Sequence, residues 1–584
     1  MSRFSIARLG VRNAVLFSSI FLLSGFTSGA FSQSATAGAK SAKELTEQLI
    51  PVTSPLVVEK CSRCHLADAK GNLSRISAVR TTPEGWEEAI KRMVRLNGLQ
   101  MTPDEARQIL RYLSDSHGLA PEEAKPIQYF VQRELIDEKL PNGDVEHACA
   151  SCHALAKPLS WRRTPQDWDY LKNMHVAFFP SIEGSFRRGG FGARQEVAGP
   201  DGEMPKQPVD IALEYIKKST PLITPEWSNW NASQRTPKLT GDWLVSGSLP
   251  GKGKFFGDMK VEPNASADGG YTTRTSLTFT SGAKWSSTGS SLVYTGYAWR
   301  GRSRSNEAMA AVDAPNTVRE VMMLSKDESE LTGRWFWGTY QEFGMDVTMQ
   351  RATGGAAVLG VDVGALKTGT SDNTMRIFGS HLPSSLSVGD IDLGPGIAVT
   401  KVVSEAPDLV TVMANVDAKA NPGRRLVAIK SIAKPDAYAV YDHMDYLKVT
   451  PVTPIAHLGS EPHAKGYMQF EAIAFSNGPD GKSNTADDID LGTVPATWKL
   501  EEFVASYGDD DIEFVGALDP KNGLFVPASD GPNPKRRSMR NNYGDVWAVA
   551  SYKPEGSTKP LAGRSYFIVS VPQYMQWDQP EVAQ

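Results

Sequence analysis

The spacing of apolar residues predicts a helical part of the chain between about residues 42 and 218. Residues 86–94 form an amphipathic pattern, and Thr82-Pro83-Glu84 before them is a typical helix start with proline in the first turn. A second helix is predicted to begin at Thr102-Pro103 and to be closed by Gly118. The first third of the chain is therefore predicted to be a helical domain.

After about residue 236 the pattern changes to short β-prone runs that are separated by turn residues. Runs such as 276–280, 291–295 and 426–429, with frequent glycine and proline between them, are typical of all-β barrels and sandwiches. The predicted fold class is therefore multidomain, α followed by all-β. The predicted domain ranges are 42–225 for the helical domain, 236–352 for a β-barrel, and 353–450 and 451–575 for two β-sandwiches.

The N-terminus has the pattern of a secretory signal peptide. Arg3, Arg8 and Arg12 precede an apolar run from Ala14 to Phe26, which is too short to span a bilayer comfortably. Small residues follow, so residues 1–32 are predicted to be removed, with an uncleaved anchor as the alternative. No membrane span is predicted in the mature chain, and the expected location is the bacterial periplasm.

Length and charge narrow the choice of function. A chain of 584 residues is too long for one core. Its 62 Lys and Arg residues nearly balance 66 Asp and Glu residues, so no nucleic acid partner is predicted. The four cysteines are more informative than either quantity.

All four cysteines lie in two copies of a Cys-x-x-Cys-His motif. The copies are Cys61-Ser62-Arg63-Cys64-His65 and Cys149-Ala150-Ser151-Cys152-His153. This is the attachment motif of c-type haem, in which the thiols bind the vinyl groups and the histidine is the proximal iron ligand. A redox-active cysteine pair and a four-cysteine zinc site are alternatives, but neither explains a histidine at the same place twice. The sequence therefore predicts two covalently bound haem c groups.

A repeat near the two motifs indicates the second axial ligands. Thr82-Pro83-Glu84-Gly85-Trp86 is repeated as Thr164-Pro165-Gln166-Asp167-Trp168, and Met93 and His175 each follow the tryptophan by seven residues. Seven residues are close to two helical turns, so each tryptophan shares a helix face with its ligand candidate. The first iron is therefore predicted to bind His65 and Met93, and the second to bind His153 and His175. Met101 remains an alternative for the first iron and Met204 for the second.

These ligand pairs predict unequal haems, because a His/Met haem generally has a higher reduction potential than a bis-His haem. His117 and His147 are interpreted as ordinary surface histidines. The β-rich part contains no recognisable catalytic motif, so no catalytic residue is predicted. The acidic loop 477–490 is interpreted as a hairpin turn, with calcium binding as the alternative. Lys535-Arg536-Arg537 is interpreted as a solvated basic loop.

The order of these features resembles the alpha subunit of quinohemoprotein amine dehydrogenase over the whole mature length. The stretches that carry the resemblance are Lys60–His65 with Ser74–Ser77, Thr82–Trp86, Gly296–Gly301, Met375–Ser380 with Asp392–Gly396, and Gly531–Pro534 with Asn541-Asn542. The resemblance implies an N-terminal helical di-haem cytochrome c domain, an antiparallel β-barrel and two immunoglobulin-like β-sandwich domains. It also implies His/Met and bis-His haems, which matches Met93 and His175. The segment between His175 and Tyr215 has no counterpart that we can place.

The resemblance further implies a heterotrimer with a β-propeller subunit and a small subunit. The small subunit carries a cysteine tryptophylquinone that oxidises primary amines to aldehydes. This chain has no spare cysteine for such a cofactor, so it is expected to be part of the enzyme as its haem subunit only. Electrons are expected to pass through its haems to an external acceptor such as a small copper protein or cytochrome c.

Two other functions fit part of the sequence. One is a stand-alone di-haem electron carrier whose β domains dock a different dehydrogenase. The other is a haem peroxidase or sensor, which requires an open iron site and is disfavoured by two ligands per iron.

Overall fold

The computed structural model describes residues 48–572 apart from several internal segments. These segments are 128–142, 151–152, 188–197, 199, 201, 266–268, 306–315, 339, 341–342 and 505–508. The predicted signal peptide, residues 1–32, and Cys152 lie outside the described residues. Among the residues that are described, no helix is both long and apolar enough to cross a membrane.

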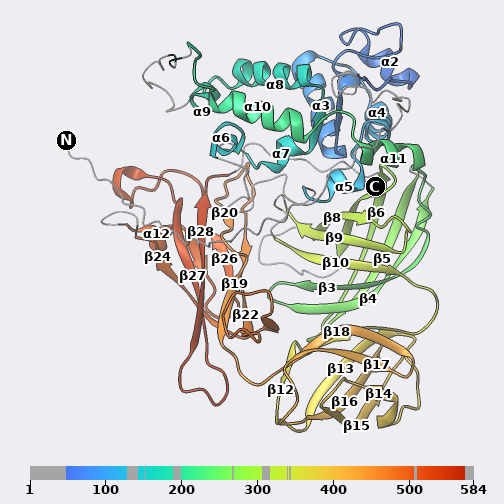
Figure 1. Cartoon of the computed structure of the whole chain (residues 1–584), viewed down its shortest axis with the longest axis vertical. Helices are drawn as coiled ribbons and strands as arrows, with labels where there is room; N and C mark the ends of the chain where they lie inside the picture. Colours follow the sequence, from blue (N-terminus) through green and yellow to red (C-terminus); the bar gives the residue numbers. More distant parts are fainter. Residues whose placement is uncertain are drawn as a thin grey trace, which may run out of the picture. The chain divides into compact units, whose positions relative to one another are not determined.

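The first part of the described chain is helical, as predicted (Figure 1). Its helices are α2 (Pro55–Cys61), α3 (Pro83–Asn97), α4 (Pro103–Ser116), α5 (Pro121–Ala124), α6 (Gly143–Val145), α7 (Ala156–Leu159), α8 (Pro165–Phe178), α9 (Ile182–Phe186), α10 (Pro208–Ser219) and α11 (Pro225–Ser233), with the short turns η1 (Ile76–Ala78) and η2 (Glu146–Ala150). Thr82, Thr102 and Thr164 cap α3, α4 and α8 through their hydroxyl oxygens, and proline follows each of them. The predicted helix starts at Thr82 and Thr102 are thereby confirmed.

A two-stranded sheet within the helical part was not predicted. Strand β1 (Val79–Thr81) pairs antiparallel with β2 (Trp161–Arg163), and Arg80 lies opposite Arg162. Both arginines stand two residues before the repeated threonine, so equivalent residues of the two repeats face each other. An antiparallel pair of equivalent residues has local twofold symmetry. The two halves of the helical part therefore meet about this pair.

A closed eight-stranded barrel follows, which confirms the predicted barrel (Figure 1). Its strands are β3 (Gly241–Leu249), β4 (Gly253–Asn264), β5 (Gly270–Phe279), β6 (Lys284–Tyr294), β7 (Ala298–Ser305), β8 (Thr317–Leu324), β9 (Glu330–Trp337) and β10 (Gly344–Arg351). Strand β10 closes the barrel by pairing with β3. Trp243, Trp285, Trp299 and Trp335 are fully buried, so the barrel has a large aromatic core.

Hydrogen bonds join the helical part to the barrel. The guanidinium of Arg300 on β7 is paired with the carboxylate of Glu84 in the first turn of α3. Tyr297 donates from its hydroxyl to the Leu119 carbonyl at 3.1 Å. The apolar residues of the two regions form one buried cluster, so the barrel supports the helices through side chains as well as through the chain connection.

The next region consists of two four-stranded sheets around one apolar core. One sheet has the order β11 (Ala357–Val361), β13 (Asn373–Ser380), β16 (Leu409–Val416) and β15 (Ile397–Glu405). The other has the order β12 (Ala365–Lys367), β18 (Ile432–Tyr441), β17 (Gly423–Ile429) and β14 (Ile391–Asp392). The β-prone run predicted at 426–429 lies in β17.

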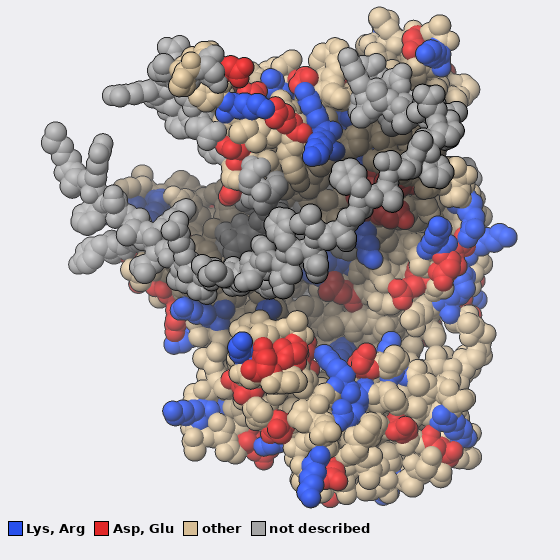
Figure 2. Space-filling view, in the orientation of Figure 1, with Lys and Arg blue, Asp and Glu red and all other residues tan. Residues whose placement is uncertain are grey.

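The last region contains three sheets with a separate core. The first sheet has the order β19 (Tyr446–Thr450), β22 (Glu471–Ser476) and β23 (Ile489–Thr493). The second has the order β20 (Ile455–His457), β28 (Leu561–Ser570), β27 (Gly544–Tyr552) and β24 (Thr497–Glu502). The third has the order β21 (Met468–Gln469), β26 (Leu524–Pro527) and β25 (Gly516–Leu518), and the short helix α12 (Asp511–Phe514) belongs to the same region. On the face drawn in Figure 2, positive and negative side chains are interspersed, in agreement with the nearly balanced charge.

Candidate haem sites

A cavity of about 200 Å³ in the helical part brings three of the predicted site residues together. Cys149 and His153 of the second Cys-x-x-Cys-His motif lie on its wall, and so does His175 of α8. Trp168 lines the same cavity, as the seven-residue spacing from His175 predicts. Three of the residues predicted for the second haem therefore line one cavity.

The predicted histidine ligands share a hydrogen-bond pattern. The Nδ1 atoms of His153 and His175 contact the carbonyls of Ala154 and Leu171 at 3.0 and 2.9 Å. His65 Nδ1 contacts the Ser74 carbonyl at 2.8 Å. A carbonyl only accepts, so Nδ1 must carry the proton in each ring, which leaves the lone pair of Nε2 for a metal.

The electrostatics of the cavity favour neutral imidazoles. Burial lowers the pKa of His153 to about 4. Burial is also the main cause that lowers the pKa of His175, and the charges of Arg163, Lys157 and Arg92 lower it further. Neutral imidazole is the form that binds iron, so both side chains are in the ligand state at neutral pH.

The wall of the cavity suits a porphyrin. The apolar residues on it are Leu171, Phe179, Ile182, Phe186, Leu213 and Ile216. An apolar lining with two nitrogen donors and a cysteine thiol is the donor set of a covalently attached haem. The residues of this cavity therefore fit the group that the sequence predicts. Part of the wall comes from α9, in the segment that the sequence comparison could not place.

The first Cys-x-x-Cys-His motif follows α2 and is more open. Cys64 is exposed, whereas Cys61 and His65 are half-buried. Met93 is half-buried in α3, where Asn97 Nδ2 approaches its Sδ at 3.7 Å. Met101, just before α4, is also half-buried and packs against the large core. Both methionines therefore remain candidates for the first iron.

Met204, the alternative ligand for the second iron, lies away from the cavity that His175 lines. Met204 is 57% exposed, in an extended segment before α10, and it is not part of the cavity wall. His147 has its side chain outside the described residues.

The interpretation of His117 as a surface residue is wrong. Its side chain is fully buried, packs edge-on against Trp86, and contacts Ser116 Oγ at 2.7 Å and the Ile50 carbonyl at 3.3 Å. Hydrogen bonds to both ring nitrogens allow burial, and the desolvation lowers its pKa to about 4. His117 is thus a core residue, and its carbonyl accepts from Trp86 Nε1 at 3.0 Å.

Sequence reasoning missed an ion cluster beside the second cavity, in which Arg163 and Asp167 are buried and Arg75 is exposed. Arg163 of β2 and Arg75 both donate to the carboxylate of Asp167, and Asp167 is 2% exposed. The Arg163 guanidinium lies 4.3 Å from the ring centre of Trp161 and 5.4 Å from that of Trp168. Arg163 and Asp167 stand on either side of the capping Thr164, and opposite charges at these two positions are a signal that could have shown the pair.

Charged side chains in the acidic loop 477–490 and the basic loop 535–537 bind other groups of the protein. Asp488 in the loop 477–490 accepts from the Tyr446 hydroxyl at 2.6 Å and from the Gly478 amide at 3.2 Å. Among the described residues, the acidic group compact enough for a metal is instead Glu502, Asp509 and Asp511. Arg536 and Arg540 pair with that group. Arg536 is buried, so the interpretation of 535–537 as a wholly solvated basic loop is wrong.

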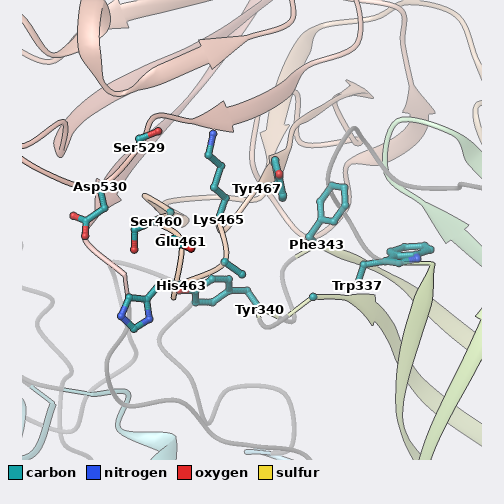
Figure 3. A pocket seen from close by; sticks show the side chains of 13 residues that line it. Trp337, Tyr340, Phe343, Ser460, Glu461, His463, Lys465, Tyr467, Ser529 and Asp530 are labelled. Atoms are coloured by element: carbon teal, nitrogen blue, oxygen red, sulfur yellow. The ribbon is translucent and has the colours of Figure 1, made fainter.

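A larger cavity, of about 520 Å³, lies in the β-rich part (Figure 3). Tyr340 and Phe343, after β9, line it together with His463 and Lys465 from the loop between β20 and β21. His457 lies next to it and stacks on Tyr340, with ring centres 4.5 Å apart. None of the predicted site residues is part of this wall.

The structure thus defines a class: a helical domain, with a cavity lined by two histidines and a motif cysteine, followed by mostly β domains. Comparison with protein families agrees. The haem-binding model of the quinohemoprotein amine dehydrogenase alpha subunit matches residues 52–193, and the models of its domains II, III and IV match residues 236–352, 355–442 and 447–582. The chain belongs to the family of quinohemoprotein amine dehydrogenase alpha subunits.

Other comparisons add little. A search among curated proteins found no match. Among solved structures, a redesigned β-barrel, mFAP1, bound to DFHBI, is 14% identical, with 19% of this chain and 94% of that chain covered and a TM-score of 0.16. Human protocadherin-24 EC1-2 is 10% identical, with 38% and 99% covered and a TM-score of 0.15. TM-scores this low do not support any conclusion about the fold or function of this chain.

Proposed function

We propose that this chain is the electron-transfer subunit of a periplasmic amine dehydrogenase complex. It would pass electrons from a quinone cofactor on a partner subunit, through two c-type haems, to an external acceptor. The observation that carries the proposal is the cavity in which Cys149 lies with two histidines, each with Nδ1 bound to a carbonyl. Membership of an alpha-subunit family supports the presence of partner subunits.

Each site residue has a defined role in this proposal. Cys61 and Cys64 attach one haem and Cys149 and Cys152 the other, with His65 and His153 as proximal ligands. Met93 and His175 complete the two iron sites. When bound, each haem supplies a one-electron couple, and the protein sets its potential through the ligands and their surroundings.

The partners follow from the family assignment and from the cysteines. All four cysteines belong to the two haem motifs, so the amine-oxidising cysteine tryptophylquinone would lie on a small partner subunit beside a β-propeller subunit. Primary amines would be oxidised to aldehydes there. A small copper protein or a cytochrome c would then accept the electrons from this chain.

The proposal includes the organisation of the chain. A signal peptide, residues 1–32, would direct export. The domains would be 42–225 for haem binding, 236–352 for the barrel, and 353–450 and 451–575 for immunoglobulin-like modules. The paired four-stranded sheets around one core support the first of these modules.

Purification of the native complex tests the function directly. We expect mass spectrometry to find a β-propeller chain and a small crosslinked chain with this subunit, and pyridine haemochrome analysis to find two haems per chain. A Cys149→Ser/Cys152→Ser variant should retain one haem, and so should the matched Cys61→Ser/Cys64→Ser variant. Isolation of the chain alone with two haems would favour the stand-alone electron carrier and would reject the complex.

A further inference from the structure

The two repeated tryptophans differ in their hydrogen bonds. Trp86 Nε1 donates to the His117 carbonyl at 3.0 Å. Trp168 is 2% exposed, and no group among the described residues accepts from its Nε1. A buried donor without an acceptor is costly, and native proteins rarely contain one without a reason. Since Trp168 lines the second haem cavity, the missing acceptor is expected to belong to the cavity's occupant.

The surroundings of Trp168 indicate the charge of that acceptor. Two guanidinium groups, from Arg163 and Arg75, share the single carboxylate of Asp167. Arg163 is 6% exposed, and its Nε has no acceptor among the described residues. The guanidinium lies over the Trp168 ring. Arg75 is exposed, so solvent screens its charge. The buried Arg163, whose Nε has no acceptor among the described residues, supplies the positive charge behind the indole, and an anionic acceptor is favoured there.

A haem group supplies such an anion, because its two propionates are its charged substituents. We infer that Trp168 Nε1 donates a hydrogen bond to a propionate of the second haem, with Arg163 as the positive charge behind the indole. This inference rests on the proposed function, because it needs a haem in the cavity of His153 and His175. Trp168 is then a positioning residue that also sets the potential of this haem.

The first half of the helical part lacks the equivalents of Arg163 and Asp167. At the positions equivalent to Arg163 and Asp167 it has Thr81 and Gly85. Its tryptophan already has a protein acceptor. The propionate contact is therefore specific to the second haem, and Trp86 provides a matched control.

The contact has a predictable electronic effect. A propionate charge close to the iron stabilises the ferric state, and a donor with a positive charge behind it offsets that charge. Loss of the donor should therefore lower the potential of the second haem. The first haem should not change.

The experiment compares Trp168→Phe with Trp86→Phe in the purified complex by spectroelectrochemical titration. We expect Trp168→Phe to weaken electron binding at the lower-potential haem about fivefold, which is about 40 mV at 59 mV per tenfold for a one-electron couple. Electrochemical infrared difference spectra should show a shifted propionate carboxylate band in this variant. Trp86→Phe should change neither the lower potential nor that band.

A second replacement keeps the test decisive if Trp168→Phe does not fold. Benzothienylalanine at position 168 preserves the ring shape and replaces the N–H by sulfur, so it removes the donor alone. Unchanged potential and carboxylate band in a folded, two-haem variant would overturn the inference. Fewer than two haems in the wild-type chain would instead overturn the proposed function, so the two failures are distinguishable.

Discussion

The two halves of the helical part share a backbone framework but differ in the charged residues beside their tryptophans. In both halves a short strand leads through a capping threonine and a proline into a helix that carries the tryptophan, α3 in one and α8 in the other. Around the capping threonine, the first half has Thr81 and Gly85 at the positions where the second half has Arg163 and Asp167. The two copies of the repeat therefore have the same strand, cap and helix, but different polar groups near the proposed haem.

The difference would place the two proposed haems in unequal surroundings on one framework. In the first half the tryptophan N–H is satisfied by protein, and the motif lies near exposed residues. In the second half His153 and His175 line a common cavity, and the charges of Arg163, Lys157 and Arg92 act on His175. Burial and charge act on a reduction potential in addition to the identity of the ligands.

Exchange of the axial ligands should have the largest effect on this comparison. Met93→His should lower the potential of the first haem, and His175→Met should raise that of the second, because thioether ligation favours the ferrous state. Each shift should be a sizeable part of the about 0.8 V range that axial ligands span. Redox titration followed by absorption spectroscopy measures both.

Met101 supplies the control for that exchange. Met101→Ala should leave the long-wavelength Met–iron band intact, whereas Met93→Ala should abolish it. The reverse result would make Met101 the ligand and would show that the seven-residue spacing does not hold in the first half.

The buried carboxylate of Glu123 should be the most sensitive point of the shared framework. It accepts from Arg80 at 2.8 and 3.0 Å and from Arg162 at 3.1 Å, so it binds the two arginines that face each other in β1 and β2. Glu123→Gln removes the charge between two buried cations. The cost should be about 3–5 kcal/mol, as for a broken buried ion pair. Thermal unfolding and hydrogen exchange of β1 and β2 measure it, with the exposed Glu122→Gln as the control.

Glu123 also predicts a pH dependence. Burial acts to raise its pKa, but the hydrogen bond and charge of Arg80 and the charge of Arg162 outweigh it and lower the pKa from 4.5 to about 2. A folded-state pKa below the unfolded value gives stability that is complete above pH 4.5 and is lost as the pH falls towards 2. The loss should be about 3 kcal/mol. An equal acid sensitivity in Glu123→Gln would contradict this assignment.

The helix starts, the barrel and the haem motifs could be predicted because each depends on residues that are close together in the sequence. Thr-Pro at a helix start is a backbone preference that depends on a few neighbouring residues, so the starts of α3 and α4 follow from sequence. The barrel follows from repeated short strands and turns. The Cys-x-x-Cys-His motifs give the haem chemistry because all their groups are contiguous.

Long-range pairing was not predictable in the same way. Strands β1 and β2 have three residues each and no apolar alternation, and their arginines, Arg80 and Arg162, share Glu123, which is distant in sequence from both. His117 was misjudged because its partners, such as the Ile50 carbonyl, are distant in sequence. The acceptor missing at Trp168 is visible only in three dimensions, since Trp86 and Trp168 occupy equal places in the repeat.

A smaller effect on stability is expected from a change at Gly85. In the first half, Gly85 packs closely against Thr81 at the positions where the second half has the Asp167–Arg163 ion pair. A Cβ at Gly85 would lie 2.3 Å from Thr81 Oγ1, and that buried hydroxyl donates to the Ser160 carbonyl at 2.9 Å. Gly85→Ala should therefore cost about 1–3 kcal/mol through overpacking. In a double-mutant cycle, Thr81→Ala should relieve most of this cost. Additive costs in the thermal unfolding of the two variants would show that the positions do not interact.

The smallest effect should come from the capping threonines, which test whether the shared framework is equivalent in both halves. Thr82 Oγ1 accepts from the Gly85 amide at 3.3 Å, and Thr164 Oγ1 accepts from the Asp167 amide at 3.2 Å. Thr82→Ala and Thr164→Ala should each cost about 1 kcal/mol in thermal unfolding. Threonine to serine at either position keeps the acceptor and should cost less.

A larger cost at Thr164 would have a specific meaning. The Asp167 amide that Thr164 caps belongs to the residue that binds both Arg163 and Arg75. If the cap also fixes that carboxylate, Thr164→Ala should lower the potential of the second haem in the same direction as Trp168→Phe. Equal costs without any change in potential would instead show that the backbone framework and the charged groups act independently, because the cap would then stabilise α8 without orienting Asp167.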